Sequence, residues 1–175
     1  MDTLKPLEND RALGILYSNL ALQELQLHNT ATAIETFHTA LEYHRKVGNE
    51  DGLAATYGQL GKTFLLTGHS QQAEAFLNNA TEHFIKLGNG PGEAGALRLL
   101  TDVYLERGDQ ISALRCLERV VQLDQTYRLP QYEEDHHRYN IAPRLITHQT
   151  MPKLNTKMPR EVHMITRKHA YTLPI

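Results

Sequence analysis

The sequence predicts an all-α protein, a solenoid of three helical hairpins followed by an irregular C-terminal tail. Three observations indicate this fold class. The apolar pattern returns with a fixed period of 40 residues, each period contains two stretches with helical apolar spacing, and polar or glycine-containing turns separate the stretches. Stacked units of this kind present an extended surface, so the pattern also predicts a protein that binds a partner.

Seven positions define the repeat, and most of them hold an apolar or small residue in every copy. They are Tyr17, Leu20, Ala21, Leu25, Ala33, Phe37 and Ala40; Tyr57, Leu60, Gly61, Leu65, Ala73, Leu77 and Ala80; and Leu97, Leu100, Thr101, Leu105, Ala113, Leu117 and Val120. Small residues at the third and fifth positions allow two helices to cross closely. Gly61→Leu should therefore overpack the crossing, whereas Gly61→Ala should be tolerated because Ala21 occupies the equivalent position.

The turns divide the chain into helices at about 10–27, 31–47, 52–67, 71–87, 92–107 and 110–127. Gly68 and Gly88 are turn residues, Ser70 is expected to be an N-cap, and Pro91 falls in a first helical turn. The repeat domain spans 10–128, with repeats at about 12–51, 52–91 and 92–130.

The remaining residues form two predicted segments. Residues 131–141 are expected to form a short polar helix that covers the exposed end of the third repeat. Residues 142–175 contain several prolines and no helical stripe, so we expect a basic and largely irregular tail.

Composition limits the possible classes of function. Cys116 is the only cysteine, which excludes an intramolecular disulfide and favours a reducing compartment. No apolar run approaches the roughly 20 residues of a membrane span, and the N-terminus lacks the apolar core of a secretion signal. We therefore expect a cytoplasmic protein with no membrane partner.

The sequence shows no pattern of an active site or a metal centre. It has no glycine-rich phosphate loop after a strand and no nucleophile elbow, and Cys116 is interpreted as a packing residue. The ten histidines, among them His38, His44 and His83, lack zinc-site spacing and are interpreted as surface residues. We expect no enzyme activity, no catalytic residue, no metal and no cofactor.

Charge is distributed unevenly along the chain. Residues 1–141 contain 12 Lys/Arg and 19 Asp/Glu, a balance of −7, whereas residues 142–175 contain 6 Lys/Arg and one Glu, a balance of +5. The basic residues of the tail are dispersed and have one aromatic neighbour, Tyr171, which argues against nucleic-acid binding. The asymmetry is compatible with a solvated surface or with a tail that docks on the repeats.

The second repeat carries a resemblance to a known family. Tyr57-x2-Leu60-Gly61-x2-Phe64, followed by Ala73-x3-Leu77-x2-Ala80, resembles the tetratricopeptide repeat signature. The first repeat departs from it with Glu24 at the aromatic position, and the third with Thr101 at the small position. The family's period is about 34 residues and its closing proline is replaced here by Ile85, so the chain is similar to a subgroup with longer helices.

The resemblance implies a right-handed solenoid whose first helices line a concave, peptide-binding groove. The candidate contacts on those helices are Asn19, Gln59, Lys62, Arg98, Ser18 and Asp102. Asn19 and Gln59 are equivalent positions whose amides suit a peptide backbone, while Lys62 and Arg98 suit a carboxylate. Lys62 and Asp102 are also equivalent, and this mixed sign argues against the basic clamp that holds acidic chaperone tails. The alternative interpretation of each residue is a solvated helix face.

The leading functional hypothesis is a non-catalytic adaptor that binds a peptide segment of a partner protein in this groove. The alternative is a regulatory or self-assembly module whose basic tail docks on the acidic repeats, in cis or in trans, which would allow a homo-oligomer. The sequence does not identify the partner.

The tail hypothesis predicts that residues 142–175 pack on the repeats of the same or a neighbouring copy. Opposite charges attract the tail, and tethering raises its effective concentration, but exposed ion pairs are weak and screened by salt. Hydrogen exchange should therefore show protected tail amides at low salt and faster exchange at high salt. Random-coil exchange at low salt, at every protein concentration, would contradict the hypothesis.

Overall fold

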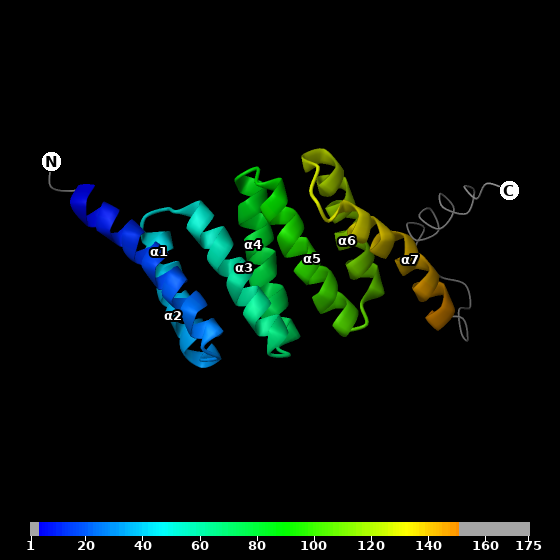
Figure 1. Ribbon diagram of the computed structural model, residues 1–175, viewed down its shortest axis with the longest axis horizontal. Coiled ribbons are helices and arrows are strands. Elements are labelled where there is room, and N and C mark those ends of the chain that lie inside the picture. Colours follow the sequence, from blue (N-terminus) through cyan, green and yellow to red (C-terminus); the bar gives the residue numbers. More distant parts are fainter. Residues whose placement is uncertain (1–3, 151–175) are drawn as a thin grey trace.

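The computed structural model describes the backbone of residues 4–150 and the side chains of residues 9–141. Over these residues the chain consists of seven α-helices and no strand, so the all-α prediction is confirmed. The helices follow one another along a row, with α1 at one end and α7 at the other (Figure 1). They are α1 (Leu4–Gln26), α2 (Thr30–Lys46), α3 (Glu50–Leu66), α4 (Ser70–Lys86), α5 (Gly90–Glu106), α6 (Gln110–Tyr127) and α7 (Tyr132–Thr150).

The helices pack as a solenoid. The most extensive contacts lie within the hairpins α1–α2, α3–α4 and α5–α6. Each hairpin then packs on the next one, and the first helices α1, α3 and α5 also touch in sequence. Helix α7 packs on α6 at the end of the row, where a further hairpin would begin. The arrangement confirms the predicted solenoid of stacked helical hairpins.

The turns repeat the same backbone geometry. Gly48, Gly68, Gly88 and Gly108 each have a positive φ, between 63° and 76°, and His28 takes this conformation in the first turn with φ 63°. The next residue is the N-cap, and in three helices its side chain accepts a hydrogen bond from a backbone N–H three residues on: Asn49 from Gly52, Asn89 from Gly92 and Asp109 from Ser112. These bonds satisfy amide groups that the helix start leaves without partners.

Ser70 is not an N-cap, so that prediction is wrong. The glycine at positive φ fixes the cap at the following residue, His69, whose side chain makes no capping bond. Ser70 is the first helical residue, and its hydroxyl donates to Glu106 at 3.1 Å. Pro91 does lie in the first turn of α5, as predicted.

The core follows the repeat register, with two exposed exceptions, Leu105 in the third repeat and Leu20 at the N-terminal end. Phe37, Leu60 and Leu77 are fully buried, and Leu100 nearly so. Leu20 occupies the same register position as Leu60 and Leu100 but is 40% exposed. Within the described residues no hairpin precedes α1. The face of α1 that carries Leu20 is therefore uncovered, whereas the corresponding faces of α3 and α5 are buried.

The C-terminal helix is longer than predicted. A helix was expected at 131–141 and irregular chain from 142 onward, but α7 continues to Thr150. The absence of an apolar stripe suggested irregular chain, yet α7 is anchored near its start by ion pairs to α5, and extending an existing helix costs less than starting one. Residues 151–175, the rest of the predicted tail, lie outside the described residues. None of the helices within 4–150 is long and apolar enough to cross a membrane.

Substitutions at Gly61 test the hairpin packing. A Cβ at this position would lie 2.5 Å from Leu77 Cγ and 3.2 Å from Leu77 N. Gly61→Leu should therefore lower the free energy of unfolding by roughly 1–3 kcal/mol or more. The same distances contradict the expectation that Gly61→Ala is tolerated, and we now expect the alanine variant to be destabilised as well.

Gly95→Ala is the matched control, because no atom lies within 4 Å of a Cβ built there and its helix is regular. This variant should gain about 0.5–1 kcal/mol from the lower entropy of the unfolded chain. Urea denaturation measures all three effects. Gly61 variants as stable as the wild type would refute the close crossing.

Candidate functional site

A pocket of about 220 Å³ lies between the first helices of repeats one and two. Residues of α1 and α3 form most of its wall, and two side chains of α2 complete it. The lining is Ile15, Ser18, Asn19, Leu22, Phe37, His44, Gly52, Ala55, Thr56 and Gln59. Three of the six residues predicted to contact a peptide, namely Ser18, Asn19 and Gln59, therefore meet in one cavity.

Asn19 and Gln59 offer their amide groups to the pocket. Asn19 is exposed and Gln59 is half-buried, and both line the cavity from facing helices. Neither side chain makes a hydrogen bond to another group within residues 9–141. Each amide can therefore donate two hydrogen bonds and accept two from a bound molecule.

Ser18 contributes differently, because it is tied to the interior. Its hydroxyl donates to Gly14 O at 3.0 Å, and its Oγ lies 3.2 Å from His44 Nε2 and 3.1 Å from Thr56 Oγ1. These bonds link α1, α2 and α3 at the base of the pocket. Ser18 is a structural residue of the pocket with no free donor for a ligand.

His44 is buried, contrary to its interpretation as a surface histidine. Its exposure is 1%, and its Nδ1 lies 3.0 Å from Asn49 Nδ2. The ring fits there because α3 has glycine at position 52, where a Cβ would lie 2.4 Å from Nδ1. A neighbour that lacks a side chain thus gives an imidazole room in the core.

The hydrogen bonds fix the protonation state of His44. Asn49 Oδ1 accepts from Gly52 N at 3.2 Å, which turns the Asn49 NH₂ group toward Nδ1. An amide nitrogen can only donate, so Nδ1 must accept and the proton resides on Nε2, which donates to Ser18. Burial, and secondly the positive charge of Arg11, lower the pKa of His44 below its ordinary value. The imidazole is therefore neutral in the folded protein near pH 7.

Lys62 lies one helical turn after Gln59 on α3. It is exposed and makes no ion pair with any residue whose side chain the structure describes. Its ammonium group is therefore available to an anionic group near the pocket, although Lys62 is not part of the lining.

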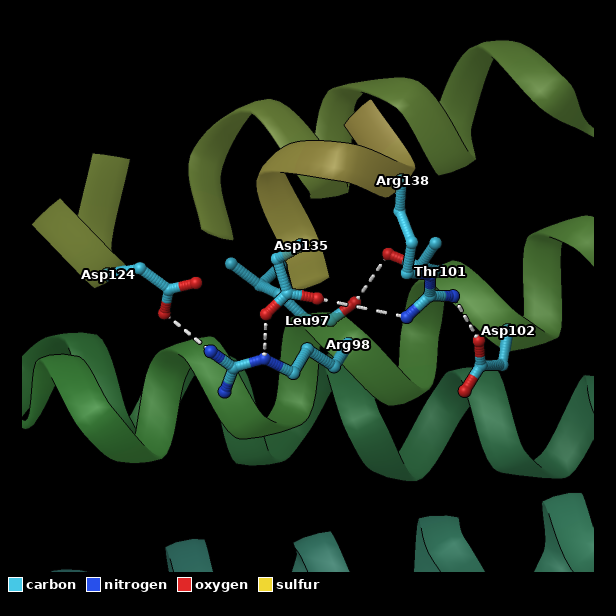
Figure 2. A network of polar contacts seen from close by, with 7 residues as sticks. All are labelled: Leu97, Arg98, Thr101, Asp102, Asp124, Asp135 and Arg138. Atoms are coloured by element: carbon cyan, nitrogen blue, oxygen red, sulfur yellow. Dashed lines mark hydrogen bonds and ion pairs between the residues drawn. The ribbon is translucent and has the colours of Figure 1, made fainter. Parts of the chain in front are cut away.

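Arg98 and Asp102 are not free groove residues. The Arg98 guanidinium donates to Asp124 of α6 and to Asp135 of α7, the latter at 2.5 Å, and Asp102 accepts from Arg138 of α7 at 2.6 Å (Figure 2). Both of these predicted peptide contacts are occupied by the chain's own side chains. The physical reason is that α7 packs beside α6 and places its Asp135 and Arg138 over α5.

The repeat register contained a signal for these pairs. Ser18 and His44 are 26 residues apart, and so are Arg98 and Asp124, at the same place two repeats later. Glu93 and Arg119 show the same separation and a bond of 2.7 Å. Complementary polar residues at this spacing face each other across a hairpin, so a search at that spacing would have predicted all three pairs.

The side chains described, 9–141, show no cluster of three or more residues suited to a metal. Burial, with a smaller contribution from Asp109, raises the pKa of Cys116 to about 11, so its thiol is protonated near neutral pH. This agrees with the interpretation of Cys116 as a packing residue.

Comparison with known proteins supports the repeat interpretation. Residues 12–86 match the family model of the tetratricopeptide repeat. Among solved structures 30 chains match, including the crystal structure of BtubC (BKLC) from P. vanneervenii, with a TM-score of 0.67 and 19% sequence identity over 84% of this chain and 68% of that chain. At this identity the likeness shows a shared fold. A comparison with curated proteins finds no match.

The buried neutral His44 predicts a loss of stability in mild acid. Because its pKa is lower in the folded than in the unfolded chain, the unfolded state binds the proton more readily, and the free energy of unfolding falls as the pH drops below about 6.5. His44→Phe should remove this component, since repeat two has Phe84 at the equivalent position, packed on Gly92.

Thermal unfolding across this pH range, with NMR titration of the His44 ring, is the measurement. His38→Gln, which removes an exposed imidazole from the same helix, should keep the wild-type pH dependence. An ordinary pKa for His44, or an unchanged pH dependence in His44→Phe, would contradict the assignment.

Proposed function

We propose that the chain is a tetratricopeptide repeat protein, because residues 12–86 match the model of that family, and that it is a non-catalytic cytoplasmic adaptor that binds an extended segment of a partner protein. Repeats of this family mediate protein–protein interactions. The proposed binding site is the pocket between α1 and α3 together with the adjoining exposed surface of the two helices.

The observation that carries this proposal is the pair of unpartnered amides that face one cavity. An extended peptide has backbone N–H and C=O groups that are not paired with each other, and Asn19 and Gln59 can bond to both kinds. The two residues lie on adjacent first helices, so one segment that crosses from α1 to α3 can reach both.

The rest of the pocket offers an apolar surface to the side chains of the bound segment. Ile15 is half exposed at its rim, and Leu22, Phe37 and Ala55 add apolar area. Such a lining, with a few polar groups that orient the ligand, is usual for binding sites. Lys62 nearby favours a segment that carries a carboxylate. Arg98 and Asp102 are left out of the proposed site because α7 occupies them.

The experiment begins with a phage-displayed library of random linear peptides selected on the protein. The affinity of a selected peptide is then measured by calorimetry for the wild type and for the double variant Asn19→Ala, Gln59→Ala. Two lost hydrogen bonds of roughly 0.5–1.5 kcal/mol each should weaken binding by about tenfold to a hundredfold.

The matched control is the double variant Asn78→Ala, Gln122→Ala, which removes the same residue types from exposed positions on α4 and α6. It should bind like the wild type. Circular dichroism checks that both variants are folded. A library without binders, or peptides that bind the Asn19, Gln59 variant with wild-type affinity, would refute the proposed site.

A further inference from the structure

The contact between α7 and the third hairpin is an ionic network, which Figure 2 shows from close by. Arg98 of α5 lies between Asp124 of α6 and Asp135 of α7. Arg138 of α7 binds Asp102 and lies 3.8 Å from the second oxygen of Asp135. Helix α7 thus contributes one carboxylate and one guanidinium to the network.

The two halves of the network differ in their exposure to water. Asp102 and Arg138 retain 46% and 28% of their side-chain exposure, so solvent screens them. Asp124 and Asp135 retain 0% and 2%, and Arg98 19%. The buried half therefore places two carboxyl groups around a single guanidinium.

One oxygen of this buried half lacks a partner. Asp124 Oδ1 accepts from Arg98, but Oδ2 is buried and forms no hydrogen bond. Two ionised carboxylates cannot bond to each other because neither has a donor, whereas a proton on one of them supplies that donor. Buried polar atoms almost always have a partner, so the unsatisfied oxygen indicates where a proton belongs.

Electrostatics favours the same conclusion. Burial raises the pKa of Asp124, and the neighbouring Asp135 raises it further, against the opposing effect of Arg98. The charged groups that face Asp124 are Arg98 on α5 and Asp135 on α7, while Arg138 and Asp102 pair with each other at the other end of the network. Without α7, Asp124 and Arg98 would form a neutral ion pair. When α7 docks, Asp135 adds a second buried carboxylate beside the same guanidinium.

We propose that α7 docks on the third hairpin with uptake of one proton by the buried Asp124 carboxyl group, which then donates a hydrogen bond to Asp135. Helix α7 is therefore a pH-responsive latch at the C-terminal end of the solenoid. Proton uptake means that docking strengthens as the pH falls and weakens as it rises, by at most about tenfold per pH unit. This sign is opposite to that of the buried His44, which destabilises the first repeats in acid.

Hydrogen exchange measured by NMR tests the latch on the whole chain. The protection factors of the amides at 132–141 are corrected for intrinsic exchange rates and divided by those of the α4 amides. This ratio should rise as the pH is lowered from about 8 to about 5. Division by the α4 values removes changes in global stability. Carboxyl carbon shifts recorded in the same titration should show that Asp124 takes up a proton at a higher pH than an ordinary aspartate does.

Two variants replace the added proton with an amide donor, and each leaves one carboxylate with Arg98. Asp135→Asn offers an N–H group to the unsatisfied Asp124 oxygen, whereas Asp124→Asn replaces that oxygen by an NH₂ group that can donate to Asp135. Either variant should make α7 protection independent of pH, at a level no lower than that of the wild type at the acid end. Glu133→Gln, which neutralises an exposed carboxylate of α7, should keep the wild-type pH dependence.

The proposal can be tested even if one of the two Asn variants folds poorly. A wild-type protection ratio that is flat, or that rises with pH, overturns the proposal without any variant. A wild-type pH dependence that persists in either folded Asn variant also overturns it, because the proton would then bind elsewhere.

Discussion

The close approach of the two helices in each hairpin is the constraint on which the rest of the structure depends. Gly61 leaves no space between its backbone and Leu77, and Ala33, Ala73 and Ala113 are buried at the matching positions of the second helices. Because the helices cross this tightly, residues 26 apart are pressed against each other. The same location therefore contains Ser18 with His44 in the first hairpin and Arg98 with Asp124 in the third. The helix packing determines where these two residues lie, and the hairpins differ in which residue types occupy the two positions.

The sequence predicted the features that depend on apolar periodicity. Five of the six helices expected in the repeats begin and end within two residues of the observed ones, because glycine turns and apolar stripes are local signals. The early start of α1, the full length of α7 and the burial of His44 were not predicted. The last two depend on packing between helices: His44 is buried because Gly52 of α3 leaves it space, and α7 is held by Arg98 of α5. At the candidate site, the register placed Asn19 and Gln59 together but did not reveal that Arg98 and Asp102 were already paired.

The hairpins are not interchangeable, although their backbones repeat. A buried polar group is costly without its partner, so His44 requires the glycine and serine of its own surroundings, and Asp124 requires Arg98. The middle hairpin fills the same location with Phe84, which also packs on a glycine, Gly92, but needs no polar partner. The buried contacts of Ser18, His44 and Thr56 also shape the pocket at the junction of the first two hairpins, which all three residues line.

The restriction of extensive contacts to neighbouring helices also has a kinetic consequence. Chains whose contacts are local in sequence close short loops and fold fast, in microseconds to milliseconds for small helical proteins. In a one-dimensional stack, order starts in one unit and spreads to its neighbours. The α3–α4 hairpin contacts a neighbouring hairpin on each side, so the two ends of the row are coupled through it. The stability of the chain is then approximately a sum over its hairpins and the contacts between neighbours.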